Sequence, residues 1–208
     1  DPKGEWTSVA RLVGGKAITL GPGLAHRLNP LDPGPRPATM GPDHEHEWVQ
    51  TVAARRRSLV GALAESVLDR ALSPLEHTSL DVALRVAATE DASLTRQRTP
   101  VLPDVVDALF TPTTQAATAA GMGVTDLASY GLEVAHALRR LVAGDLAGMF
   151  DGASTVDVDP SAPMVTVDLS ALEHSAPPAA MRVALTCAST WMESAIADPD
   201  GGRRWIIY

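Results

Sequence analysis

A run of acids and histidines at residues 43–47, "DHEHE", carries side-chain types that bind transition metals. His44 and His46 are two residues apart, and on a helix side chains at that spacing point in different directions. No distant pair of cysteines or histidines completes a ligand set. We therefore interpret the run as the solvated start of a helix, where acids interact favourably with the helix dipole, and keep a metal site as the alternative.

Gly14, Gly15 and Lys16 are the residue types found in phosphate-binding loops. Such a loop has the pattern G-x-x-x-x-G-K-[ST], whose backbone N–H groups converge on the phosphate at the start of a helix. That pattern is absent from the 208 residues, and Lys16 leads into the short run 17–20, which is mostly apolar. The segment therefore predicts a buried strand rather than a nucleotide-binding loop.

Two groups of arginines, residues 55–57 and 139–140, could contact nucleic acid or a partner protein. Three consecutive residues spread around most of a helix, so Arg55, Arg56 and Arg57 cannot all face one partner. The net charge of −8 also argues against a broad nucleic-acid surface, which needs clustered cations. We interpret these arginines mainly as surface charge, with a partner contact as the alternative.

The composition and the single cysteine favour a mostly helical protein without disulfide bonds. The chain is 45% hydrophobic but only 4% aromatic, which favours helices packed on helices. Cys187 lies in the apolar run "RVALTCASTWM", where no neighbouring His or Lys is placed to activate the thiol, so we predict a core residue. A lone cysteine also excludes a disulfide framework and favours a reducing compartment. No apolar run approaches the ~20 residues that span a bilayer, which predicts a soluble chain.

Residues 1–38 are rich in glycine and proline. They predict one buried strand, Lys16–Leu20, followed by irregular chain. Asn29 and Asp32 belong to the turn-forming run "NPLDPG", in which such side chains bond their own downstream backbone.

Residues 39–150 have the spacing of helices. Leu59, Leu63 and Val67 form one apolar stripe. Ser73 and Glu76 flank a proline in the pattern of a capping box, which predicts a helix start. A shorter helix begins near Pro103, and another follows over 127–141. We predict connecting segments at 89–100 and 111–123.

Residues 151–208 change period. The β-branched run 164–167, ending at Asp168, predicts a buried strand of a parallel sheet. A helix over 178–196 follows, and 203–208, "RRWIIY", predicts the start of another buried strand. Phe150, Asp151 and Gly152 suit an anchored turn, with one buried aromatic and one glycine of permissive φ.

This order of elements predicts the fold class. A strand, a long helical excursion, then strand, helix and strand indicate an α/β fold: a partial parallel sheet with a large all-α insertion, mostly helical overall. We divide the chain into an N-terminal core piece at 1–38, a helical insertion at 39–150 and a second core piece at 151–208.

Several of these motifs together resemble one family. "DPKGEW", "GGKAITLGPG", "RLNPLDPG", "LRRLVAGDLAGMFDG", "VTVDLSAL" and "RRWIIY" occur in the order found in the conjugative type IV secretion ATPases of the TraC-like, VirB-class kind. These belong to the HerA–FtsK superfamily of RecA-like motors. In that family the D-P-K-G-E segment ends a strand, and the hydrophobic strand resembling "RRWIIY" leads into the Walker B acids.

The resemblance implies roles for a few residues. Asp1, Lys3 and Glu5 are expected near the nucleotide side of the sheet, because ligands of parallel sheets gather at the carboxyl ends of strands. There they would tune the phosphate or Mg²⁺ environment. The alternative is a turn in which Gly4 permits the bend and the charges are solvated. Asp168 could face the same site, or cap the next turn together with Ser170.

The resemblance also implies a function for a longer parent protein. That protein would use ATP and Mg²⁺ to energise a secretion channel, act as a hexamer at the inner membrane with channel components, and be cytoplasmic and peripheral. The present 208 residues contain neither a Walker A motif nor the Walker B acids, so we expect them to be an inactive fragment. The alternatives are a DNA-translocating coupling protein or HerA-like helicase, and a helical interaction module. Open sheet edges at 1–20 or 203–208 predict self-association.

Overall fold

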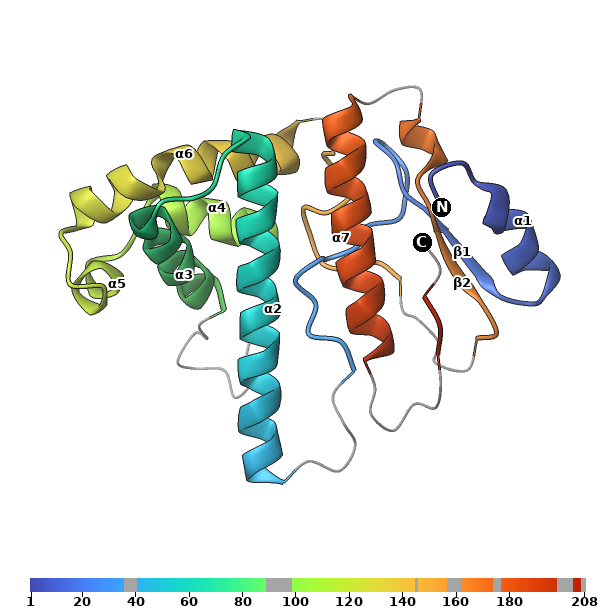
Figure 1. The fold of residues 1–208 in the computed structure, drawn as a ribbon, viewed down its shortest axis with the longest axis horizontal. Coiled ribbons are helices and arrows are strands. Elements are labelled where there is room, and N and C mark those ends of the chain that lie inside the picture. The colour runs from blue at the N-terminus through green and yellow to red at the C-terminus, as the bar shows by residue number, and fades with distance from the viewer. Residues whose placement is uncertain are drawn as a thin grey trace.

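The computed structural model describes residues 1–35, 41–88, 99–144, 146–156, 162–173, 177–197 and 204–206. Its elements follow in the order α1 (Glu5–Leu12), β1 (Lys16–Thr19), α2 (Pro42–Leu68), α3 (Pro74–Ala88), α4 (Leu102–Phe110), α5 (Thr114–Ala119), α6 (Val124–Ala143), β2 (Val165–Asp168), the 3₁₀ turn η1 (Ser170–Leu172) and α7 (Pro178–Ile196). The strands and α1 lie at one end, α3–α6 at the other, and α2 and α7 stand between them (Figure 1).

The two strands come from the two ends of the sequence and pair in parallel. Ile18 of β1 lies opposite Val167 of β2, and Thr19 lies opposite Asp168. Ile18 is fully buried, as expected for strands of a covered parallel sheet. The predicted α/β fold with a large helical part is therefore confirmed. The division of the chain at residues 38 and 150 stays a prediction.

The predicted last strand is wrong where it can be examined. Arg204–Ile206 belong to neither strand of the sheet, and the Trp205 side chain is 77% exposed. The rest of "RRWIIY" lies outside the described residues. An apolar run becomes a strand only when a neighbouring strand accepts and donates its backbone hydrogen bonds, and the described sheet consists of β1 and β2 alone.

Helix α1, which precedes β1, was not predicted from the sequence. Both carboxylate oxygens of Asp1 accept from backbone N–H groups of its first turn, at 3.1 Å from Glu5 N and 2.9 Å from Trp6 N. Gly4 has a φ of 71°, which suits the predicted turn. The apolar residues of this segment are spaced as one stripe, a helix signal that our prediction missed. The structure nevertheless buries Thr7 and Ala10 and leaves the larger side chains of that stripe exposed.

The helical part follows its sequence signals closely. The Ser73 hydroxyl accepts from Glu76 N at 3.3 Å, and a carboxylate oxygen of Glu76 accepts from Ser73 N at 2.7 Å, so the predicted capping box is confirmed. One prediction was wrong: the segment 111–123 contains α5, whose start is capped by the Thr113 hydroxyl accepting from Ala116 N at 3.2 Å.

A single buried cluster joins the sheet to the helices. It includes Ile18 of β1, Leu63 of α2, Leu138 of α6, Val167 of β2 and Trp191 of α7. The helical region therefore shares its core with the strands. Within the described ranges, no helix is both long and apolar enough to cross a bilayer.

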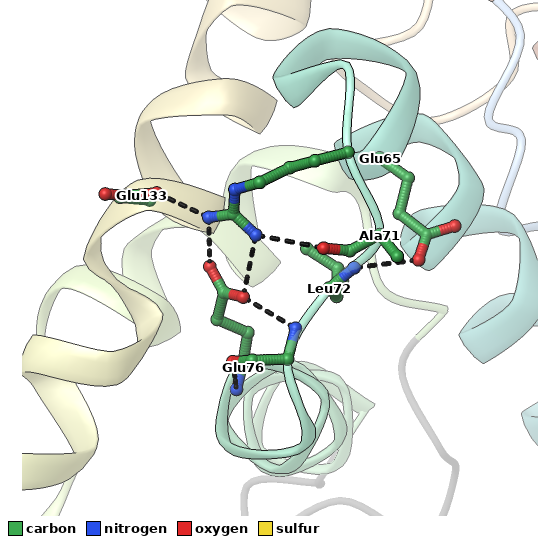
Figure 2. A network of polar contacts seen from close by, with 7 residues as sticks. Glu65, Ala71, Leu72, Glu76 and Glu133 are labelled. Carbon is green, nitrogen blue, oxygen red and sulfur yellow. Dashed lines mark hydrogen bonds and ion pairs between the residues drawn. The ribbon is translucent and has the colours of Figure 1, made fainter.

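An ion-pair network fixes the connection between α2 and α3 (Figure 2). The Arg70 guanidinium donates in a fork to the Glu76 carboxylate, at 2.7 and 3.0 Å, and also reaches Glu133 of α6 at 2.5 Å. Glu65 accepts from Leu72 N at 2.9 Å. The hydrogen bonds from Arg70 lower the pKa of Glu76 to about 2, although burial opposes them. Fork-shaped pairs of this kind are the stronger ones.

The depressed pKa of Glu76 predicts acid sensitivity. Its charged form is favoured by folding, so its stabilising contribution is present above the unfolded-state pKa of about 4.5 and is lost as the pH falls towards about 2. Glu76→Gln is expected to lower the urea midpoint at pH 7, and the gap to the parent protein should close between about pH 4.5 and 2. Glu133→Gln, whose side chain is 69% exposed, should change little at any pH. A gap that stays constant with pH would contradict the assignment.

Candidate functional site

A buried carboxylate lies at the carboxyl end of β2. The Asp168 side chain accepts from the Thr7 hydroxyl at 2.8 Å and from Ser170 N at 2.9 Å. The predicted cap on the turn containing Ser170 is thus confirmed. Thr7 was not expected, because it lies 161 residues away in an unpredicted helix.

Competing effects set the charge state of Asp168. Burial alone would raise its pKa, but hydrogen bonds from Ser170 and Thr7 outweigh burial and leave the pKa below its ordinary value. Asp168 is therefore ionised at neutral pH and acts as a hydrogen-bond acceptor that ties α1 to the sheet.

Asp1 lies beside Asp168 on the edge of β2 that faces away from β1. Its backbone N donates to Val167 O at 2.9 Å, and Leu169 N donates to Asp1 O at 3.0 Å. This alternation is the bonding pattern of parallel strands. The "DPKGEW" segment therefore starts at the carboxyl end of the sheet, with Lys3 and Glu5 exposed next to it.

The three predicted site residues differ in their contacts. The Asp1 carboxylate is committed to the first turn of α1 by its two backbone hydrogen bonds. Lys3 and Glu5 point into solvent, and their proposed closeness to a nucleotide stays a prediction.

Asp168→Ala is expected to loosen α1. It removes the acceptor of Thr7 and Ser170, which should lower the free energy of unfolding by about 1–3 kcal/mol. The rate of amide hydrogen exchange should rise more in α1 than in α6. Thr7→Val, which removes one donor, should have a smaller effect of the same kind. Exchange that rises equally in α1 and α6 would argue against a local tie.

The turn at Asn29 forms a second polar cluster. Asn29 is 1% exposed, its side-chain oxygen accepts from Leu31 N at 3.0 Å, and its side-chain nitrogen donates to Pro100 O at 3.0 Å. Its backbone N donates to the Ser154 hydroxyl at 2.8 Å, and the Trp191 indole donates to the same hydroxyl at 3.2 Å. The predicted structural role of Asn29 is confirmed.

Two of the three consecutive arginines hold that same turn. Arg55 donates to Asp32 O at 2.6 Å and Arg56 donates to Leu31 O at 2.7 Å, so interpreting them as surface charge was wrong. Burial, assisted by the neighbouring Arg55, lowers the pKa of Arg56 to about 10 although Asp32 opposes the shift. Burial likewise lowers the pKa of Arg55. Arg57 is exposed and lies 3.6 Å from Asp81.

The turn at residues 148–152 is anchored as expected, with one correction. Phe150 is 1% exposed, and Asp151 accepts from Gly148 N at 2.9 Å and lies 3.0 Å from Arg27 Nε. Gly152 is not among the residues with positive φ. A Cβ there would lie 2.5 Å from a guanidinium nitrogen of Arg27, which is the far end of a flexible side chain and can shift.

The described part of the chain supports neither a metal site at the histidines nor a reactive cysteine. His44 and His46 are exposed near the start of α2, and no group of three His, Cys, Asp or Glu side chains among the described residues could hold a metal. Cys187 is buried, and burial raises the pKa of its thiol to about 12. The thiolate is therefore disfavoured, and Cys187 is a core residue as predicted.

Comparison with known proteins shows a similarity of fold to a solved structure. No protein-family model matches the sequence, and no curated protein is a significant match. Among solved structures, VirB4 of Thermoanaerobacter pseudethanolicus superposes with a TM-score of 0.60 at 16% identity. The match covers 93% of this chain and 66% of that one, so the chain spans less than two thirds of VirB4. At this identity the likeness concerns the fold: the chain is built like part of VirB4.

Proposed function

We propose that this chain is the central part of the motor domain of an ATPase that powers type IV secretion or conjugation. The observation that carries the proposal is the parallel pairing of Asp1 with β2, beside Asp168. It sets "DPKGEW" at the carboxyl end of a parallel sheet, where α/β proteins bind their ligands. The likeness of fold to VirB4 and the order of the sequence motifs support the same proposal.

The chemistry of the parent protein would be phosphoryl transfer from ATP to water. The 208 residues contain no phosphate-binding motif, so that loop and the acids that hold Mg²⁺ would be supplied by sequence outside them. Lys3 and Glu5 are the exposed charged residues that would lie near the phosphates. Asp1 would act indirectly, by fixing the start of α1.

The test compares the 208-residue chain with the longer protein from its parent gene. The chain alone is expected to give no ATP turnover, whereas the longer protein is expected to hydrolyse ATP. In the longer protein, Lys3→Ala and Glu5→Ala should lower turnover, while Arg11→Ala, at an exposed position in the last turn of α1, should not. Turnover by the 208 residues alone, or a parent gene without a Walker A motif upstream, would contradict the proposal.

Self-association of the 208-residue chain forms part of the proposal. Helix α1 and the residue after it expose four large apolar side chains, with exposures of 45% for Trp6, 39% for Val9, 86% for Leu12 and 51% for Val13. A contiguous apolar face of this kind promotes association. Light scattering should show species larger than a monomer, reduced by Leu12→Glu. A clean monomer at all concentrations would count against self-association.

A further inference from the structure

A shallow groove lies where α2, α6 and α7 meet. The end of α6 passes between the end of α2 and the start of α7 (Figure 1). Two adjoining hollows of about 250 and 90 Å³ lie there and share Val67 and Arg140 as lining residues. Together they form one groove with room for one or two side chains.

The walls of the groove are mostly apolar. They are formed by Val67 and Leu68 of α2, Ala137 of α6, and Ala180 and Val183 of α7. Val67 and Leu68 are partly buried and pack against the main core. The groove is therefore an accessible edge of the core, and an apolar side chain placed in it would be removed from water.

Among the described residues around the groove, one cation has no charged partner. Glu133 is paired with Arg70, and the His136 ring lies edge-on to Phe110 with the ring centroids 5.1 Å apart. Arg140 makes no hydrogen bond or ion pair with any residue that the structure describes, and it lines both hollows. The groove thus combines apolar walls with one available guanidinium.

From this combination we infer that the groove is a docking site for an acidic–apolar peptide segment of a partner protein. A Leu- or Phe-type side chain would fill the hollow, and an adjacent carboxylate would accept from Arg140. Guanidinium groups favour carboxylates because two N–H donors match two oxygens. A single arginine does not supply the run of cations that a nucleic-acid backbone needs. The inference does not rest on the proposed motor function.

The test uses the ¹⁵N-labelled 208-residue chain and two small probes of matched shape, 4-methylpentanoate and the neutral 4-methylpentanamide. The carboxylate is expected to shift amide resonances at Val67, Ala137, Arg140 and Ala180, and to bind about tenfold more tightly than the amide. An acetylated and amidated Leu-Glu dipeptide should shift the same resonances.

Variants on α6 then separate the groove from its surroundings. Arg140→Gln should abolish the preference for the carboxylate, and Arg140→Lys should keep part of it. Arg139→Gln is the matched control, because Arg139 lies over the Phe110 ring, 5.8 Å from its centroid, and does not line the groove. Equal binding of acid and amide, shifts elsewhere, an unchanged preference in Arg140→Gln, or single-stranded DNA shifting the same resonances would each overturn the inference.

Discussion

The Phe150→Ala variant is expected to lose about 3–5 kcal/mol of unfolding free energy. Phe150 is 1% exposed and belongs to the cluster that joins the sheet to the helices. Truncation removes a large apolar surface from the core and leaves a cavity that the surrounding helices can fill only in part. The loss should be global, because the same cluster contains residues of β1, α2, α6 and α7.

Urea unfolding followed by circular dichroism measures this effect. Phe150→Leu, which keeps most of the volume, should lose clearly less. Phe110→Ala is the matched control: Phe110 is only partly buried, and the His136 ring lies against it. If the Phe110 and Phe150 variants lose equal stability, Phe150 does not have the central position that its burial indicates.

Replacing Asn29 with alanine is expected to cost about 2–4 kcal/mol, since two buried backbone groups lose their partners. Leu31 N loses its acceptor, and Pro100 O loses its donor. Neither group faces bulk water, because Leu31 and Pro100 are themselves buried. The penalty of leaving them unpaired should therefore exceed the value of an ordinary surface hydrogen bond.

Asn29→Asp separates the two bonds. The aspartate can still accept from Leu31 N, but its second oxygen then faces Pro100 O instead of donating to it. Asn29→Asp should thus be destabilised at pH 7 and partly recover at low pH, where a protonated carboxyl can donate again. Gln115→Ala, which removes an exposed amide from α5, should be nearly neutral. Equal losses at Asn29 and Gln115 would show that the amide bonds contribute little.

Local signals in the sequence determined much of the helical region and both strands. Ser73 and Glu76 lie three residues apart, so their capping box depends on one turn of chain alone. The bond from Leu31 N to Asn29 is equally local. The β-branched run ending at Asp168 predicted β2 because burial on both faces leaves a continuous apolar pattern. Helix α7 begins and ends where its pattern predicts.

Tertiary structure alone decided the contacts between distant segments. Arg55 and Arg56 look like surface charge in sequence, yet each donates to a carbonyl more than twenty residues away. The Thr7 hydroxyl donates to Asp168 across 161 residues, and that contact helps to hold α1 against the sheet. Conversely, Trp205 lies in an apolar run typical of a buried strand, yet its side chain is exposed in the structure. Sequence specifies hydrogen bonds that close within a turn, whereas bonds across the fold depend on which surfaces packing brings together.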